Sequence, residues 1–169
     1  MTFRPKLAIA ALMALGVTVS SLPAGIADSP IHGQAHTIDG DTLAIGERRI
    51  RLLGIDACEL SQTAQTENGQ TIECGQIAKR WLEQILQQTV TCHPTGTDYY
   101  GRTLAHCGTE RIPDIAAQGI YEGIYFLYEY RNKPTRPDLI PLKNSAKQAG
   151  RGIWSWRVQS PRQARRTKR

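Results

Sequence analysis

The sequence predicts an α+β fold, a small five-stranded β-barrel with about three covering helices. Three observations support this prediction. Short strand-like runs follow residue 30 and are separated by glycine-containing turns, as in an antiparallel meander. A later segment has apolar residues at helical spacing. The chain has 169 residues, 40% of them hydrophobic, which is enough for one domain with its own core but not for two.

The N-terminus has the pattern of a secretory signal peptide over residues 1–27. Arg4 and Lys6 form a charged region, Leu7 to Val19 an apolar run, and Gly25-Ile26-Ala27 a cleavage site. An uncleaved membrane anchor is the alternative, but an apolar run of about a dozen residues is short of the roughly 20 that a span needs. We expect a secreted or periplasmic protein with no membrane attachment after cleavage.

The net charge of +6 is unevenly distributed along the chain. Residues 1–27 contain two basic and no acidic residues, and residues 157–169 contain six basic and none acidic. The intervening domain, residues 28–156, therefore holds 13 basic against 15 acidic residues, a net charge of −2. We expect the polar, Arg-rich tail 157–169 to be disordered. It either holds polyanions without sequence preference or is a solvated end.

The domain opens with three strand-like runs: Ile31 to Thr37, Thr42 to Ile45 and Arg48 to Ile55. Asp39-Gly40 and Gly46-Glu47 are turn signals between them. Together they predict a three-strand meander, the usual start of a small antiparallel barrel. Two further strand-like runs lie later in the chain: Thr89 to His93 and Arg102 to His106.

The clearest helical pattern runs from Cys74 to Gln88. Apolar residues recur there at helical spacing: Ile77, Trp81, Leu82, Ile85 and Leu86. We expect an amphipathic helix that covers the barrel. The polar segment before it, Leu60 to Thr71, is rich in Gln, Thr and Asn and is expected to be a loop.

Two shorter helices are expected toward the C-terminus. Pro113 and Asp114 begin the first, and Gly119 ends it, in keeping with proline in the first turn and glycine after the last. The second runs from about Pro141 to Ala149 and stops at Gly150 or shortly after. Five strands and helices in this order suit a barrel of the oligonucleotide-binding (OB) type.

The four cysteines all lie after the signal sequence, at Cys58, Cys74, Cys92 and Cys107. In an oxidising compartment they allow three pairings. Cys92 and Cys107 flank a turn between strand-like runs, so a Cys92–Cys107 bridge is the simplest assignment, and Cys58–Cys74 would tie the loop after the third strand to the next helix. A zinc site is the alternative, but no Cys-x-x-Cys pair exists and the spacing of Cys92 and Cys107 fits a hairpin.

Four separated pieces of the sequence combine acidic residues, arginines and tight turns: Ile38-Asp39-Gly40-Asp41-Thr42, Arg51-Leu52-Leu53-Gly54-Ile55-Asp56-Ala57-Cys58-Glu59, Asp98-Tyr99-Tyr100-Gly101-Arg102 and Gly152-Ile153-Trp154-Ser155. A strand exposes alternate side chains on one face, so Arg51 at its start and the acids after its end can converge on one ligand. A hard divalent ion prefers carboxylate oxygens, and a phosphodiester prefers bidentate arginine. In order and spacing, these pieces resemble the staphylococcal nuclease (thermonuclease-like) family over roughly Ile31 to Trp154.

The resemblance implies a site for one calcium ion. Asp41 and Asp56 match the carboxylate ligands of the family, and the backbone carbonyl of Ala57 matches a third ligand. A carbonyl ligand does not depend on the side chain, so alanine is suitable there. Waters and a substrate phosphate would complete the roughly six to eight oxygens that calcium takes.

The resemblance also implies catalytic roles. Arg51 and Arg102 match the arginines that grip the phosphate and meet the charge that grows in the transition state. Glu59 matches the acid that orients or deprotonates the attacking water. Family members cut single-stranded DNA and RNA with little base preference and leave 3′-phosphates, and we expect the same here. Tyr100, Tyr125 and Tyr128 are expected near the bound nucleotide. For at least one of Tyr125 and Tyr128, packing in the core is the alternative.

Position 58 departs from the family pattern, because Cys58 stands where proline is usual. A bridge to Cys74 would stiffen the loop that presents Glu59 in place of the proline. A free thiol beside the catalytic acid is the alternative.

Two other functions remain open at this stage. One is a catalytically silent OB-fold module that binds nucleic acid or another polyanion. The other is an envelope accessory protein, for example one associated with surface polysaccharide. In either case a monomer is expected.

Overall fold

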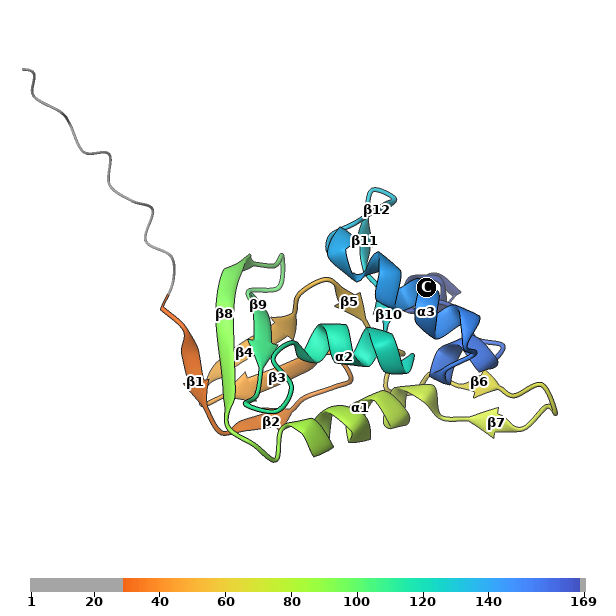
Figure 1. Cartoon of the computed structure of the whole chain (residues 1–169), viewed down its shortest axis with the longest axis horizontal. Helices are drawn as coiled ribbons and strands as arrows, with labels where there is room; N and C mark the ends of the chain where they lie inside the picture. Colours follow the sequence, from red (N-terminus) through yellow and green to blue (C-terminus); the bar gives the residue numbers. More distant parts are fainter. Residues whose placement is uncertain (1–28, 168–169) are drawn as a thin grey trace, which may run out of the picture.

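The chain bends at Gln34 and so divides the first predicted strand into β1 (Ile31–Gly33) and β2 (Ala35–Thr37). These two strands lie at opposite ends of the strand order in the sheet. In the computed structural model, which describes residues 29–167, β1 pairs with β8 (Val90–Thr97), and β2 pairs with β3 (Thr42–Ile45). The strand order is β1-β8-β9-β4-β3-β2, so the sheet begins and ends on one stretch of chain and curls into a barrel (Figure 1). The OB-type α+β fold is confirmed, and the five predicted strands become six because the first is split. The predicted signal peptide, residues 1–27, lies outside the described residues.

The remaining elements follow in chain order: β4 (Arg48–Leu52), β5 (Ile55–Asp56), β6 (Ala64–Gln65), β7 (Thr71–Ile72), α1 (Cys74–Ile85), β9 (Thr103–Gly108), α2 (Ile115–Glu122), β10 (Phe126–Leu127), β11 (Glu129–Tyr130), β12 (Lys133–Pro134), a 3-10 turn η1 (Pro137–Leu139), α3 (Ile140–Gln148), a second 3-10 turn η2 (Gly152–Ser155) and α4 (Pro161–Thr167). Among residues 29–167, no helix is both long and apolar enough to cross a membrane.

One strand pair differs from the predicted antiparallel barrel. β4 and β9 run parallel, with Arg51 beside Leu104, while β3 places Thr42 opposite Arg51. The parallel pairing forms because α1 and β8 intervene between β4 and β9 and reverse the chain direction. The register places the start of β9 beside the middle of β4, and from the β8–β9 turn the Arg102 side chain reaches Thr42 at the start of β3.

Aliphatic residues from the strands fill the barrel and are almost completely buried: Leu43, Ile50, Leu52, Ile55 and Val90. The predicted helix α1 is confirmed and packs on this core with Ala78 and Leu82, and α2 packs on it with Ile115 and Ile120. In Figure 1 the two helices run along the same side of the barrel.

The predicted end of α2 at Gly119 is wrong. The helix continues to Glu122 and ends at Gly123, which has the left-handed conformation (φ 73°) and donates its N–H to the Gly119 and Ile120 carbonyls. Gly119 serves packing instead, because a Cβ there would lie 2.3 Å from the ring of Tyr125. That close approach comes from the tertiary structure and leaves no trace in the local sequence.

Two segments predicted to lack regular structure are ordered. The short hairpin β6–β7 begins within the expected loop Leu60 to Thr71 and ends at Ile72, and Gln65 forms a bridge with Arg157. The predicted disorder of the tail is wrong over 157–167, where α4 forms and buries Pro161 and Ala164. The cause is a set of contacts with residues about 100 positions earlier, which composition does not show.

Both predicted disulfides are present. Cys92 and Cys107 are directly opposed on β8 and β9, and Cys58 is joined to Cys74 at the start of α1. All four cysteines are therefore used, which excludes the zinc alternative for them and a free thiol at Cys58.

Candidate active site

A cleft of about 830 Å³ opens at the end of the barrel where the turns before β3, after β5 and between β8 and β9 meet. Its lining includes five of the residues predicted from the sequence: Asp41, Arg51, Ala57, Glu59 and Arg102. Asp56 lines a smaller hollow of about 230 Å³ beside it and bonds to Arg51. The structure thus brings all the predicted polar site residues to one place.

Arg51 joins the two aspartates that the sequence singled out. Its Nη1 donates to Asp41 Oδ1 at 2.6 Å, and its Nη2 donates to Asp56 Oδ1 at 3.1 Å. Burial lowers the pKa of Arg51, but the charges of Asp41 and Asp56 outweigh that effect and leave it above its usual value. Arg51 is therefore a permanent, oriented cation at the floor of the cleft.

The turn before β3 holds Asp41 in place. The Asp41 N–H donates to Asp39 Oδ1, and Asp41 Oδ2 accepts the Ala57 N–H at 3.1 Å. A Cβ at Gly40 would lie 2.7 Å from that of Ala57, so this approach requires glycine. Burial, and then the negative charge of Asp41, raises the pKa of Asp39. The acids at this turn thus repel one another, and a cation would relieve the repulsion.

Asp98 positions Arg102. Its Oδ1 accepts the N–H groups of Tyr100 and Arg102, and its Oδ2 accepts from Arg102 Nε at 2.8 Å. Arg102 Nη1 also donates to Thr42 Oγ1 at 3.2 Å, and that hydroxyl donates to Asp41. Sequence reasoning missed Asp98 and Thr42 as positioning residues. The spacing of Asp98 and Arg102 within one tight turn was the available signal for the first.

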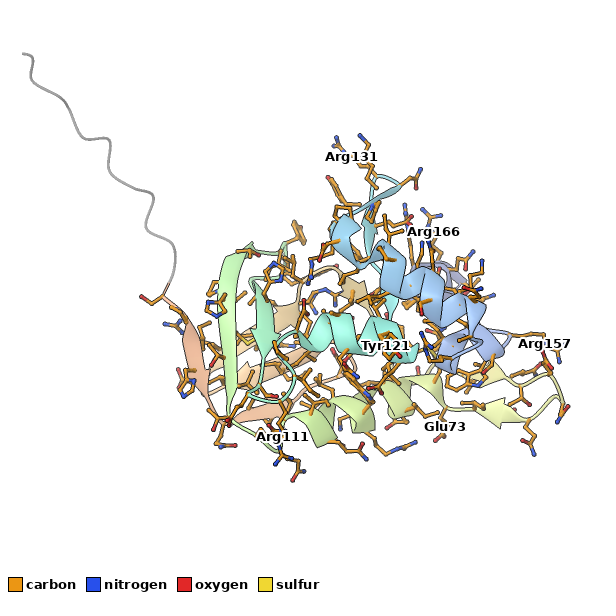
Figure 2. All side chains as sticks on the ribbon, viewed as in Figure 1. Glu73, Arg111, Tyr121, Arg131, Arg157 and Arg166 are labelled. Atoms are coloured by element: carbon orange, nitrogen blue, oxygen red, sulfur yellow. A yellow bond between two sulfur atoms is a disulfide. The ribbon has the colours of Figure 1, made fainter. Side chains whose placement is uncertain are left out.

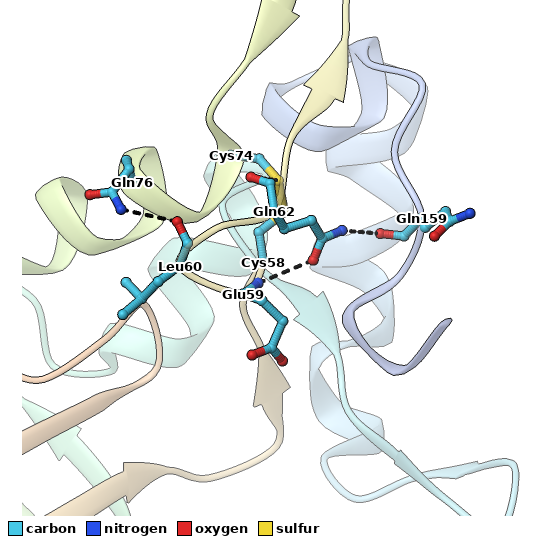
Figure 3. The surroundings of a disulfide bond; sticks show 7 residues. All are labelled: Cys58, Glu59, Leu60, Gln62, Cys74, Gln76 and Gln159. Carbon is cyan, nitrogen blue, oxygen red and sulfur yellow. Dashed lines mark hydrogen bonds between the residues drawn. A yellow bond between two sulfur atoms is a disulfide. The ribbon is translucent and has the colours of Figure 1, made fainter. Parts of the chain in front are cut away.

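The loop that presents Glu59 is braced on several sides, as Figure 3 shows. The Glu59 N–H donates to Gln62 Oε1, and Gln62 Nε2 donates to the Gln159 carbonyl at 2.7 Å. A Cβ at Gly75 would lie 1.9 Å from the Glu59 carbonyl oxygen, so α1 packs directly on this backbone. With the Cys58–Cys74 bridge, these contacts fix the backbone and direct the carboxylate away from the disulfide.

Arg165 enters the same cleft from α4. Its Nη1 donates to Glu59 Oε1 at 2.5 Å, and its Nη2 donates to Asp56 Oδ2 at 2.9 Å. Burial raises the pKa of Asp56, although the hydrogen bonds and charge of Arg165 oppose the effect. Sequence reasoning missed Arg165 because it placed this residue in a disordered tail, and no local pattern distinguishes it from its basic neighbours.

The three tyrosines predicted to lie near the nucleotide occupy different environments. Tyr100 and Tyr128 line the cleft, and their rings lie 5.6 Å and 5.9 Å from the guanidinium carbons of Arg102 and Arg51. The assignment of Tyr125 to the nucleotide is wrong: it is completely buried and packs edge-on against Trp81. The neighbouring Tyr99 is 96% exposed at the cleft mouth and offers a further aromatic ring.

The donor set fits a hard divalent cation in an open site. Among residues 29–167, no three His, Cys, Asp or Glu side chains form a closed metal-binding group. Asp41 and Asp56 nevertheless supply buried carboxylate oxygens, and the Arg165 guanidinium already lies as a cation against Asp56 and Glu59. Such a site leaves positions for water and a phosphate oxygen.

An OB-type barrel with two guanidiniums and buried carboxylates in one cleft is the arrangement expected of a protein that acts on phosphodiesters. The chain belongs to the staphylococcal nuclease homologue family, whose model matches residues 49–156. The matched range contains Arg51, Asp56, Glu59 and Arg102, while Asp41 precedes it.

Several relatives match most of the chain, and three of them show its range of similarity. A succinoglycan biosynthesis protein, ExoI, from Rhizobium meliloti is 31% identical over 88% of this chain and 79% of its own length. A micrococcal nuclease from Shigella flexneri is 29% identical over 89% of this chain and 88% of its own length. A protein named as an uncharacterized endonuclease, from Escherichia coli O157:H7, is 31% identical over 74% of this chain and 78% of its own length. The chain is thus a member of a nuclease family with nuclease-named relatives.

Proposed function

We propose that the protein is a calcium-dependent nuclease that hydrolyses single-stranded DNA and RNA with little sequence preference. One observation carries the proposal: Arg51, Arg102 and Glu59 line a single cleft together with the buried carboxylate of Asp41. Contacts to phosphate hold no sequence information, so a site built from guanidiniums and carboxylates acts on any strand that fits.

Each side chain has a role that follows from its chemistry. Arg51 and Arg102 donate hydrogen bonds to the phosphate oxygens and stabilise the charge that grows on them in the transition state. Glu59 accepts a proton from the attacking water. Asp41, Asp56 and the Ala57 carbonyl would hold calcium, which neutralises the phosphate when bound. Tyr100 and Tyr128 offer rings on which bases stack.

The proposed hydrolysis is a single displacement at phosphorus. The water oxygen bonds to phosphorus, its proton passes to Glu59, and the bond between phosphorus and the 5′ oxygen breaks. The 5′ oxygen leaves with the bonding electron pair and takes a proton from solvent water, while Glu59 returns its proton to solvent, so the products are a 3′-phosphate and a 5′-hydroxyl. Analysis of the product ends checks this direction of cleavage, and 5′-phosphate ends would contradict it.

The first experiment is digestion of heat-denatured DNA by the protein from Asp28 onward, with calcium and with a calcium chelator. Glu59→Gln should reduce the rate by about 10²- to 10⁴-fold, because general base catalysis contributes that much. Glu67→Gln removes one charge from an exposed residue of the β6–β7 turn and should leave the rate unchanged. Cleavage that persists in Glu59→Gln, or that is indifferent to the chelator, would reject the proposal.

Secretion is part of the proposal. It rests on the signal pattern of residues 1–27 and on disulfides that use all four cysteines, which suit an oxidising compartment. The mass of the protein recovered from periplasm and medium would test it, with loss of residues 1–27 expected. We propose that the mature protein acts as a monomer.

A second function has one specific observation in its favour. The relative named for succinoglycan biosynthesis covers 88% of the chain, which fits an envelope protein associated with surface polysaccharide. In that case the barrel would bind a polyanion without cutting it. Binding of denatured DNA by a folded protein that shows no cleavage with calcium would favour this alternative.

A further inference from the structure

The C-terminal helix α4 places a guanidinium on two of the three acidic side chains that the proposed reaction needs. Arg165 contacts Asp56 and Glu59, which precede it by 109 and 106 residues. The Arg165 side chain is 44% exposed and that of Asp56 only 6%, so the guanidinium covers the carboxylate from the solvent side.

Other contacts hold α4 in place without Arg165. Pro161 and Ala164 are buried, and Gln159 accepts a hydrogen bond from Gln62. Ser160 and Gln163 exchange hydrogen bonds at the start of the helix, in the manner of a capping box. We therefore expect the helix to keep its position when residue 165 is changed, so that a substitution there tests the guanidinium.

Arg165 and a divalent cation require the same Asp56 oxygens, because Arg165 donates from Nη1 to Oδ1 at 3.3 Å and from Nη2 to Oδ2 at 2.9 Å. A carboxylate oxygen bonded to a guanidinium has fewer lone pairs for a metal ion, and two cations on one buried carboxylate repel each other. Arg165 also occupies one oxygen of Glu59, the proposed base. Because Arg165 is tethered, it remains at high effective concentration beside these acids.

We propose that Arg165 is a resident competitor of the divalent cation, so that α4 sets the calcium concentration at which the site fills. This inference rests on the proposed function for the identity of the cation. The Arg165 guanidinium leaves Asp56 and Glu59 when calcium binds. The nuclease site is thus closed at low calcium and opens as calcium rises.

Calorimetric titration of calcium into the protein from Asp28 onward, without nucleic acid, tests the competition directly. Arg165→Gln should bind calcium about fivefold more tightly than the unchanged protein, the expected effect of removing one exposed ion-pair competitor. Arg166→Gln is the matched control, because Arg166 is the next residue, exposed at the surface (Figure 2), and its loss changes the net charge equally. It should shift the affinity much less. Arg165→Lys should fall between the two, because lysine keeps the charge without the forked contact.

Each outcome has a distinct meaning. Equal affinity in Arg165→Gln and Arg166→Gln, or weaker binding in Arg165→Gln, would overturn the competition and leave the proposed nuclease function intact. Absence of calcium binding in all the proteins would overturn the competition together with the proposed cofactor. Cleavage is not the readout, so a failure of the nuclease assay would not be mistaken for either result.

Discussion

At the residue scale, the cleft is a network in which each charged group is held by another. Arg102 reaches Asp41 through Thr42, and Arg51 joins Asp41 to Asp56. Asp56 in turn shares Arg165 with Glu59. Since hydrogen bonds in such a network hold one another in place, a change at one member should alter the orientation of its neighbours.

Asp98 provides a prediction at this scale. Burial raises its pKa, but hydrogen bonds from the backbone and guanidinium of Arg102 outweigh burial and lower the pKa below 3.8. An acid with a depressed folded pKa stabilises the fold above its unfolded pKa, and that stability is lost as pH falls through the folded pKa. Asp98→Asn should therefore be less stable than the unchanged protein at pH 5 to 7, and the difference should shrink below pH 3.8.

Urea unfolding of both proteins across this pH range measures the difference. If the difference in unfolding free energy between the two proteins stayed constant from pH 7 to pH 3, the Asp98 carboxylate would not be the cause of that difference. Asp98→Asn should also lower nuclease turnover at neutral pH, because Arg102 loses the partner that orients it.

At the element scale, the contact between α1 and the Glu59 loop determines where the backbone of Glu59 lies. Gly75 lies in the first turn of the helix, and a Cβ there would overlap the Glu59 carbonyl oxygen at 1.9 Å. Gly75→Ala should destabilise the protein by about 1–3 kcal/mol, because backbone must move to admit the methyl group. It should also lower turnover by displacing Glu59.

The control for Gly75→Ala is Gln84→Ala, an exposed change in the same helix that also introduces alanine. Thermal unfolding and DNA digestion of both variants separate the two effects. If Gly75→Ala were as stable and as active as Gln84→Ala, the packing of α1 on Glu59 would not position the acid.

At the scale of the whole molecule, two disulfides of nearly equal span have different positions. Cys58–Cys74 closes 16 residues between the barrel and α1, while Cys92–Cys107 closes 15 residues within a strand pair. Loss of either bridge should cost about 3 kcal/mol of stability by loop entropy. Only the first braces the Glu59 loop.

Paired serine variants test this difference. Cys58→Ser with Cys74→Ser should lower both stability and turnover, while Cys92→Ser with Cys107→Ser should lower stability and leave turnover of the folded fraction unchanged. Urea unfolding and digestion rates at low temperature provide the two measurements. Equal loss of turnover in both double variants would contradict a specific role for the first bridge.

The sequence by itself determined the barrel, helix α1, the two cysteine pairs and the polar residues of the cleft. These features are local: turns at Asp39-Gly40 and Gly46-Glu47, helical spacing after Cys74, and motifs whose spacing sets which side chains share an end of the barrel. The interactions that produce these features join residues close together in the chain, so the features can be predicted without a structure.

Only the tertiary structure decided the parallel β4–β9 pair, the burial of Tyr125 and the place of Arg165. Tyr125 looked like a nucleotide contact, yet it packs closely on Gly119 of α2 and on Trp81 of α1. Arg165 looked like part of a solvated tail, yet it pairs with acids more than 100 residues earlier. Such contacts depend on which surfaces pack together in the folded protein. Burial and charge pairing between residues far apart in the chain produce no local sequence pattern from which they could be predicted.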